Sequence, residues 1–549
     1  MIDIKQELKL SVKEAIKKSG YPEVVFDIEE PKDKSFGDLS TNAVLILTKK
    51  TKEVPKNIAD KIISNISTSE YISQPEYING FINFSYKSKY IVENLDQVLT
   101  EAENFGKSKR GKNRKVLVEF VSANPTGQLH IGNARGGPIG QVIANLYENF
   151  GYSVDREFYV NDIGTQIEKF AKTLVHYHKL EKDPKTEFPE GGYPGEYMKD
   201  VFKEIDHEHH KTIKELPEEE LIQFMAKEGL RIMIRDIKQD LQQLGIKYES
   251  WIYESDILCS GKTDRVVNLL TKTGNTSLKE GALWFKNPED PEMADRESVL
   301  KRSDADKSYT YFAKDISYHL DKFERGYIKA INVWGANHFG HIPRLSAAMR
   351  AISVPEDWLS IILYQNVRLK NGEEIVQMSK RRGNVVTVSD LEKFGVTGDA
   401  FKFMILMHDL NSLIDFDIEL AKDTSEKNPV FYVKYAHARI ASILRKSDIK
   451  TEDINIKTWK LEAPEEKNLA KEISKYPEIL EETFADFKLQ RLANYSFNLA
   501  TKFHNFYDKC HVLGEKPEVE KSRLALIMAT KIVLKNILDI LDLDAPEKM

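Results

Sequence analysis

The spacing of apolar side chains near the N-terminus predicts helices. They recur at every third or fourth position, at Ile4, Leu8, Val12, Ala15 and Ile16. This spacing predicts an amphipathic helix, which Gly20 and Pro22 then end. A second helix is expected to be capped by Ser40 or Thr41 and to run through Leu47.

A strand-like segment follows. Residues 78–84 place Ile78, Ile82 and Phe84 on one face, which predicts a single short strand. Helices and a strand in the first hundred residues predict an α+β domain over residues 1–106. The basic run 107–115 is expected to be a flexible linker to the next domain; an RNA-contacting arm is the alternative.

The pattern changes after this run. Residues 116–121 form a short apolar segment typical of a buried parallel strand, and a turn at 122–127 leads into a glycine-rich helix start. A similar strand pattern returns at 328–335. Strand, loop and helix in this order predict a Rossmann-type parallel-sheet domain over residues 107–427, with a charged insertion at about 160–295.

The last part of the chain has helical spacing almost throughout. From Asn428 onwards apolar residues recur at the intervals of a helical bundle, for example Leu524, Ile527, Ile537 and Leu541. We therefore expect an all-α domain over residues 428–549.

Composition narrows the class of protein. The chain has 549 residues, a formal net charge of −6, 41% hydrophobic and 30% charged residues. This composition is typical of a globular protein. It excludes a wholly disordered chain and a surface that is uniformly basic for nucleic-acid binding. Two cysteines, Cys259 and Cys510, cannot form a disulfide framework or a four-cysteine zinc site. No signal peptide or membrane span is recognisable, so a soluble cytoplasmic protein that does not enter membranes is expected.

Two segments carry candidate chemistry. The first, residues 127–137, contains Gly127, His130, Gly132 and Asn133 between a predicted strand and a helix. Small residues let backbone N–H groups approach a phosphate, and His130 can donate to a phosphate oxygen whose charge grows in the transition state. A structural histidine beside glycines is the alternative.

The second segment, residues 377–384, reads Gln-Met-Ser-Lys-Arg-Arg-Gly-Asn. Its cations could stabilise a leaving pyrophosphate. Taken alone, such a cluster is more often a solvated surface loop. The histidine-rich run 207–210 is interpreted as a solvated helix face rather than a metal site.

Together the two segments resemble the HIGH and KMSKS signatures of class I aminoacyl-tRNA synthetases. Longer stretches narrow the resemblance to arginyl-tRNA synthetases over essentially the whole chain. These stretches are residues 35–42, 118–127, 315–326, 428–440 and 545–549. Three positions depart from the signatures: Asn133, Gln377 and Asn337.

The resemblance implies an arginine–tRNA ligase, which joins L-arginine to AMP from ATP and passes it to the 3′ end of tRNA(Arg). It implies catalytic roles for His130, Asn133, Ser379, Lys380 and Arg381, and an ATP site made of Gly127, His130, Gly132, Asn133, Gly335, Asn337, His338, Met378 and Lys380. It implies an arginine site made of Glu119, Asn124, Tyr311 and Asp315. Carboxylates suit a guanidinium, which only donates hydrogen bonds. The alternatives are an ion pair for Glu119 and a helix N-cap for Asp315.

The expected partners follow. ATP is a substrate that brings Mg²⁺, no protein-bound metal is expected, and the chain is expected to act as a monomer. By the resemblance, the N-terminal domain contacts the tRNA and the helical domain reads its anticodon. Three other functions remain: an inactive relative that only binds RNA or a partner, a synthetase for another amino acid, and a nucleotidyltransferase that makes a small cofactor. The roughly 120 residues after Asn428 argue against the last of these.

Overall fold

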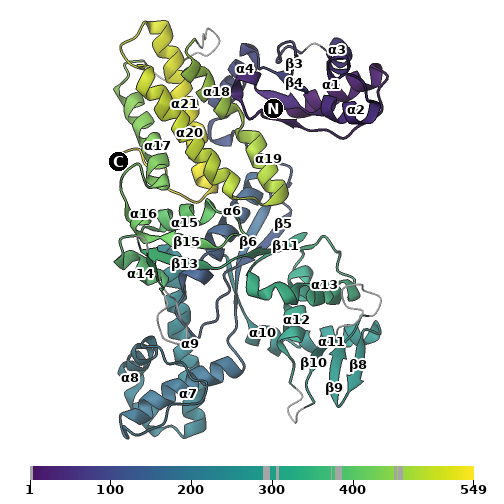
Figure 1. Cartoon of the computed structure of the whole chain (residues 1–549). Coiled ribbons are helices and arrows are strands. Elements are labelled where there is room, and N and C mark those ends of the chain that lie inside the picture. Colours follow the sequence, from purple (N-terminus) through teal and green to yellow (C-terminus); the bar gives the residue numbers. More distant parts are fainter. Residues whose placement is uncertain are drawn as a thin grey trace.

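The computed structural model describes residues 4–67, 69–287, 297–303, 308–371, 374–376, 386–449, 454 and 462–549. A parallel sheet lies at its centre, the N-terminal and helical C-terminal regions lie at one end, and two lobes extend from the other (Figure 1). No helix in the described part of the chain is long and apolar enough to span a membrane.

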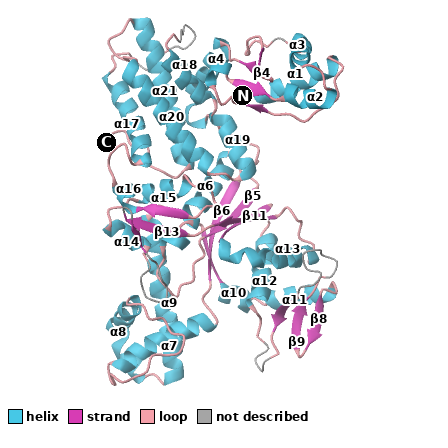
Figure 2. Ribbon diagram, in the orientation of Figure 1, coloured by secondary structure: helices cyan, strands magenta, loops and turns pink. Residues whose placement is uncertain are grey.

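The N-terminal region is a small antiparallel sheet with helices packed on it, as Figure 2 shows. The strand order is β1-β2-β4-β3. The elements are α1 (Ile4–Lys18), β1 (Ile28–Glu29), η1 (Lys34–Phe36), β2 (Leu39–Thr41), α2 (Ala43–Thr51), α3 (Pro55–Asn65), β3 (Glu76–Ile78), β4 (Phe81–Phe84), α4 (Ser88–Glu101) and η2 (Ala102–Asn104). Apolar residues at helical spacing thus form α1, as predicted.

Two local predictions in this region are wrong. Residues 78–84 form a hairpin rather than one strand, because Asn79 and Gly80 both adopt positive φ, at 50° and 93°, and turn the chain between β3 and β4. Asn-Gly is the sequence most suited to such a turn. Ser40 and Thr41 lie in β2, and the residue before α2 is Asn42.

The basic run before the central domain is not a flexible linker. Its backbone is hydrogen-bonded to the end of helix α6 (Gly136–Asn149), where the N–H of Gly111 donates to the Phe150 carbonyl at 2.8 Å. The Arg110 guanidinium lies over the rings of Phe150 and Phe484, 4.4 and 4.8 Å from their centres, and pairs with Glu481. The cations of this run are partly used to pack the central domain against the C-terminal helices.

The central sheet is parallel, with the order β12-β11-β5-β6-β7. Residues 116–121 and 328–335 correspond to β5 and β11, as predicted. Helix α6 lies close to β5 because Gly140 has no side chain: a Cβ there would come within 2.1 Å of the Phe120 ring. The elements are β5 (Lys115–Phe120), α5 (Ile131–Ala134), α6 (Gly136–Asn149), β6 (Ser153–Val160), β7 (Ser250–Tyr253), β11 (Lys329–Gly335), η3 (Ala336–His341), α13 (Ile342–Ala351) and β12 (Leu359–Tyr364).

The segment predicted as one insertion, about 160–295, is divided by the sheet. Its first part forms the helical lobe of α7 (Thr165–Leu180), α8 (Tyr197–Glu215) and α9 (Glu218–Gln243). The chain then returns to the sheet as its edge strand β7. The second lobe carries the small sheet β10-β9-β8 (Figure 1). Its elements are α10 (Glu254–Cys259), α11 (Lys262–Lys272), β8 (Thr276–Lys279), β9 (Ala282–Phe285), β10 (Ser298–Lys301) and α12 (Tyr311–Glu324).

The remaining elements lead into the helical C-terminal region. A three-stranded sheet of order β14-β13-β15 precedes it. Its helices share one hydrophobic core with the central sheet and with α4, and Leu524, Ile527, Ile537 and Leu541 are fully buried there, as the predicted bundle requires. The elements are β13 (Val367–Asn371), β14 (Glu374–Val376), α14 (Val388–Lys393), α15 (Gly398–Leu406), β15 (Ile414–Asp417), α16 (Ile418–Lys422), α17 (Pro429–Lys446), α18 (Pro464–Ser474), α19 (Tyr476–Asp486), α20 (Gln490–Lys509) and α21 (Pro517–Ile540).

Candidate active site at the carboxyl edge of the parallel sheet

The strand order sets the position of the site. From β5 the chain proceeds to β6 on one side, whereas β11 lies on the other side of β5 and is followed outwards by β12. The direction of winding therefore reverses between β5 and β11. Ligands of open parallel sheets bind at the carboxyl ends of the strands at such a point. The loops that leave β5 and β11 there carry most of the predicted site residues.

The first signature segment forms a tight turn after β5. His130 is the residue before the short helix α5, and its Nδ1 accepts a hydrogen bond from the Asn133 N–H at 3.2 Å. A Cβ on Gly132 would lie 3.1 Å from that nitrogen, which is closer than a side chain normally tolerates. Gly127 lies beside Tyr197 of α8, whose hydroxyl donates to the Thr126 carbonyl at 2.7 Å. Since Nδ1 accepts, the neutral imidazole carries its proton on Nε2 and can donate from there.

Arg135, which no sequence argument singled out, fastens this turn to the rest of the sheet. Its side chain is fully buried, and its guanidinium donates to the carbonyls of Gln365 at 2.7 Å, Ser412 at 2.8 Å and Asp409 at 3.0 Å. The end of β12 and the loop before β15 are thereby held against the first signature segment.

The second signature segment, with Met378, Ser379, Lys380 and Arg381, lies outside the described residues. The chain that follows it is described and lies against the first segment. The Ile131 N–H donates to the Val386 carbonyl at 3.2 Å, the Val388 N–H donates to the Leu129 carbonyl at 2.9 Å, and His130 pairs with Thr387 in an antiparallel bridge. Residues 386–388, which follow the second segment, are thus held against the first segment.

Gly335 is the last residue of β11, and Asn337 and His338 lie in the 3₁₀ turn η3 that follows it. A Cβ on Gly335 would lie 2.7 Å from the Asn337 Oδ1, so a side chain at this position would displace the Asn337 amide. The side chains of Asn337 and His338 are exposed at this edge. They lie at the end of the strand beside β5, where the predicted ATP site requires them.

Tyr311 and Asp315 come from helix α12. The residue before α12 is Thr310, whose side chain accepts from the Ala313 N–H, so the helix-cap alternative for Asp315 is wrong. The Asp315 carboxylate is 23% exposed and is hydrogen-bonded to His341 of η3. Tyr311 is 48% exposed, and its hydroxyl lies near Gly164, at the start of α7.

Glu119 and Asn124 approach from β5 and its loop. Glu119 is buried, and its carboxylate accepts from the Lys322 ammonium at 2.5 Å and from the Ser122 hydroxyl at 2.9 Å. The ion-pair alternative for Glu119 is therefore what the structure shows. The Asn124 amide donates to the Gln166 side chain at 3.1 Å.

Two further residues, Tyr159 and Glu254, lie near Asp315 and Glu119 and were not anticipated from the sequence. Tyr159 lies near the end of β6. Burial raises the pKa of its phenol, and the nearby carboxylates of Glu254, Asp315 and Glu119 raise it further. Glu254 pairs with Lys314 at 2.7 Å. The sequence signal that could have pointed to Tyr159 was its position near the end of β6, the strand next to β5. Of the three carboxylates near this phenol, Glu119 and Glu254 are paired with Lys322 and Lys314. Asp315 is instead contacted by two imidazoles and is the carboxylate suited to a donor-rich cation.

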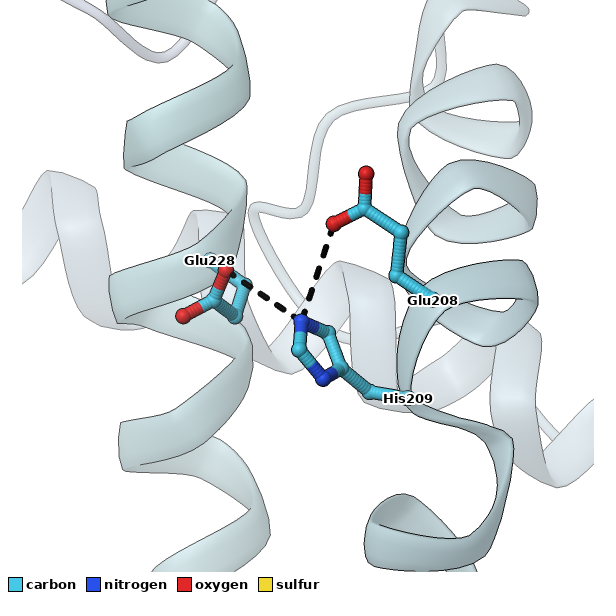
Figure 3. Close-up of side chains that lie close together, drawn as sticks. All are labelled: Glu208, His209 and Glu228. Atoms are coloured by element: carbon cyan, nitrogen blue, oxygen red, sulfur yellow. Dashed lines mark ion pairs between the residues drawn. The ribbon is translucent and has the colours of Figure 1, made fainter.

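The histidine-rich run 207–210 lies far from these residues, in the helical lobe. Figure 3 shows Glu208 and His209 of α8 facing Glu228 of α9, and their ligand atoms lie within 4.8 Å of one another, as a metal ion would require. Glu228 is the partner that sequence reasoning did not find. However, Arg231 already contacts both carboxylates, at 2.5 Å for Glu208 and 2.7 Å for Glu228.

Comparisons with known proteins agree with this architecture. Family models match residues 6–86 (arginyl tRNA synthetase N terminal domain), 94–401 (tRNA synthetases class I (R), catalytic domain) and 433–549 (DALR anticodon binding domain). The arginine–tRNA ligase of Caldanaerobacter subterraneus subsp. tengcongensis is 41% identical over 95% of this chain and 93% of its own. That of Carboxydothermus hydrogenoformans is 38% identical over 99% and 98%.

Solved structures show the same fold. A Campylobacter jejuni structure assigned to an arginyl-tRNA synthetase is 32% identical, with a TM-score of 0.75, over 84% of this chain and all of its own. The match to the Thermus thermophilus arginyl-tRNA synthetase structure covers all of both chains at 22% identity, with a TM-score of 0.78. The fold and the catalytic-domain match thus define a class I aminoacyl-tRNA synthetase. Within that class, the chain belongs to the arginyl-tRNA synthetase family.

Proposed function

We propose that this chain is an active arginine–tRNA ligase and that the pocket around Asp315 selects arginine. In the first step a carboxylate oxygen of arginine attacks the α-phosphorus of ATP, and the bond to pyrophosphate breaks. In the second step a ribose hydroxyl of the terminal adenosine of tRNA(Arg) attacks the arginyl carbonyl, and AMP leaves. The observation that supports the proposal is the Asp315 carboxylate, contacted by His319 and His341 and near the end of β6, while the adjacent strand β5 leads into the first ATP signature.

The residues have distinct tasks in this scheme. His130 donates from Nε2 to a phosphate oxygen as its charge grows, and Gly127, Gly132, Gly335, Asn133, Asn337 and His338 shape the nucleotide site around it. Asp315 and Tyr311 receive the guanidinium, and Asn124 holds the amino or carboxylate end. Glu119 acts near that end through its pair with Lys322. Most of the rate gain comes from positioning and electrostatic stabilisation.

The remaining assignments concern the nucleotide loop, the ion and the tRNA. Met378, Ser379, Lys380 and Arg381 stabilise the leaving pyrophosphate. ATP is bound as its Mg²⁺ complex, in which phosphate oxygens and waters are the main ligands. Residues 1–106 contact the tRNA, and residues 428–549 read its anticodon. The match of residues 433–549 to an anticodon-binding family supports the last assignment. The chain acts as a cytoplasmic monomer.

The test is aminoacylation with purified chain and the matching tRNA pool, supplied with arginine, lysine or glutamate. Only arginine should be joined to tRNA. Arginine-dependent exchange of pyrophosphate into ATP, measured with tRNA present, excludes the inactive relative if it proceeds. Absence of both activities in folded protein would overturn the proposal.

Lys380→Ala sharpens the assay. Loss of one donor to developing charge typically lowers the rate about 10²–10³-fold. The matched control is Lys422→Ala, since Lys422 is exposed and pairs with Glu419 on the same helix, α16. Near wild-type turnover in Lys380→Ala would refute the role given to the second signature.

A further inference from the structure

Two imidazoles flank the Asp315 carboxylate. His341 contacts the carboxylate through Nε2, and His319 contacts it through Nδ1 at 3.1 Å while also bonding the Asp315 carbonyl at 2.8 Å. The indole of Trp334 packs against both rings, with ring centres 5.9 and 6.1 Å apart. If either imidazole carried a second proton, its positive charge would offset the carboxylate that faces the pocket.

Arg344 determines the tautomer of His341. Its Nε donates to the His341 Nδ1 at 2.7 Å. A guanidinium has no acceptor, so Nδ1 must be the unprotonated nitrogen and Nε2 must carry the proton. His341 therefore donates to Asp315 as a neutral imidazole. Arg344 lies on α13, and its guanidinium carbon lies over the Phe312 ring, 5.3 Å from the ring centre.

Lys322 and Asn332 determine the tautomer of His319 in the same way. The Lys322 ammonium donates to the Asn332 Oδ1 at 3.0 Å, which fixes the orientation of that amide. The amide nitrogen then donates to the His319 Nε2 at 2.7 Å. Nε2 is thus an acceptor, and Nδ1 carries the proton that points at Asp315. Because Lys322 also binds Glu119, one chain of contacts joins the two acidic groups of the pocket.

We propose that Arg344 and Asn332 are positioning residues that keep His341 and His319 neutral, so that Asp315 retains its full negative charge for the guanidinium of arginine. This inference rests on the proposed function. Neither residue needs to touch the substrate. Each blocks the far nitrogen of one imidazole with a donor, which excludes a second proton there, and each carboxylate oxygen keeps a second acceptor position for the ligand.

Burial alone would raise the pKa of Asp315, but the electrostatic attraction of His319, together with the hydrogen bonds from His319 and His341, holds that pKa well below its usual value. The carboxylate is therefore ionised throughout the physiological range. Among the described residues, the other charged or titratable groups close to these side chains include Glu119, Lys322, Tyr159, Glu254, Lys314, His338, Tyr311 and Tyr318.

The experiment combines imidazole NMR with steady-state kinetics. Nitrogen-15 shifts of histidine-labelled enzyme, assigned with His341→Asn and His319→Asn, report which nitrogen carries each proton. The wild-type enzyme should show an unprotonated Nδ1 on His341 and an unprotonated Nε2 on His319. An imidazolium or the opposite tautomer at either residue in the wild type would overturn the inference, whatever the variants do.

Kinetics then test the consequence. Arg344→Met removes the donor, so His341 can take up a second proton; arginine KM should rise about tenfold, the loss expected when a charge-assisted contact is weakened, while ATP KM stays the same. Arg344→Lys keeps a donor and should restore most of the affinity for arginine. The matched control is Arg350→Met on the same helix, where Arg350 pairs with Glu356 at 3.8 Å. Unchanged arginine KM in Arg344→Met would overturn the inference.

A parallel measurement separates this inference from the proposed function. If Asp315→Asn leaves arginine KM unchanged, the arginine pocket itself is misplaced. If Asp315→Asn raises arginine KM but Arg344→Met changes neither the His341 tautomer nor the KM, the pocket is correct and the positioning role is refuted.

Discussion

The pocket around Asp315 and the cluster around Glu228 contain the same kinds of side chain in different arrangements. Both combine a carboxylate, a histidine and an arginine from neighbouring helices. In the helical lobe, Arg231 donates directly to Glu228 and Glu208, and His209 lies 3.6 and 3.7 Å from the same two carboxylates (Figure 3). In the Asp315 cluster, Arg344 donates to His341, and the imidazoles of His341 and His319 contact the carboxylate.

The difference shows how one set of residues can give a structural tie or a binding site. A guanidinium on a carboxylate neutralises it and satisfies its acceptors. A guanidinium on the far side of an imidazole leaves the carboxylate charged and supplies only a neutral donor. The cluster of Glu208, His209, Glu228 and Arg231 therefore connects α8 to α9. The Asp315 carboxylate, which has no lysine or arginine bound directly to it among the described residues, is available for a cationic ligand.

The largest expected effect comes from removing the charge at Asp315. Asp315→Asn should raise arginine KM at least tenfold, since a charge-assisted hydrogen bond contributes about 1.5–3 kcal/mol. ATP KM should hardly change, because other residues are assigned to the phosphates. Glu208→Gln is the counterpart in the lobe and should leave both constants unchanged. Equal effects of the two substitutions on arginine KM would remove the distinction between the clusters.

Arg231→Met should remove the ion pairs with Glu208 and Glu228 and leave the catalytic activity unchanged. Glu228 has a 10% exposed side chain, and a buried carboxylate that loses its partner costs about 1–3 kcal/mol of the free energy of unfolding. Thermal or urea unfolding measures this loss, and arginine KM should stay at the wild-type value. Arg265→Met, which breaks the exposed pair with Glu324, is the control and should cost under about 1 kcal/mol. A stable Arg231→Met protein with impaired arginine binding would contradict the account.

Asp240 of α9 extends the comparison to a buried carboxylate whose hydrogen-bond donor is a hydroxyl. Burial raises its pKa from 3.8 to about 6, partly offset by the Ser389 hydroxyl at 2.6 Å. Between pH 4 and 6 the folded chain holds a proton that the unfolded chain has lost, so this group's contribution to stability falls as pH rises through that window. Above it the buried charge is a constant cost.

Asp240→Asn should therefore stabilise the folded chain by about 1–2 kcal/mol at pH 7.5 and give no gain at pH 4. Denaturant unfolding at the two pH values measures the difference. A gain of equal size at both values would show that the benefit comes from packing rather than from charge.

The smallest effect is expected from metal ions at Glu208, His209 and Glu228. Arg231 occupies the carboxylate oxygens that an ion would need, so Zn²⁺ added to chelator-treated enzyme should leave the melting temperature unchanged. The same titration on Arg231→Met is the informative control, because that variant exposes the three ligands. A Zn²⁺-dependent rise in the wild type would overturn the structural interpretation of the cluster.

Long, strongly patterned segments of this chain could be predicted from the sequence. The strands at β5 and β11 and the helical C-terminal region follow from continuous apolar runs and helical periodicity, which few alternatives satisfy. The hairpin at Asn79–Gly80 was missed because apolar alternation was followed through a turn whose residues favour positive φ. The basic run 107–115 was misjudged because charge predicts solvation, whereas Arg110 packs its guanidinium on two aromatic rings.

The candidate site shows a similar division. Asp315 and Tyr311 could be singled out from the motifs they share with the family. His341, Arg344, Asn332 and Tyr159 could not, because each acts through a contact between elements far apart in the sequence. Their roles depend on which nitrogen or oxygen faces which neighbour, and such geometry leaves no local pattern in a single sequence.

The central claim is that the ionised Asp315 carboxylate selects arginine by the positive charge of its guanidinium. Citrulline tests it directly, because it has the shape of arginine with a neutral urea in place of the guanidinium. The measurement is kcat/KM for arginine and for citrulline in tRNA charging, for the wild type and for Asp315→Asn. The account predicts that the wild type strongly prefers arginine and that Asp315→Asn lowers this preference at least about tenfold. A preference that stays the same in Asp315→Asn would contradict it.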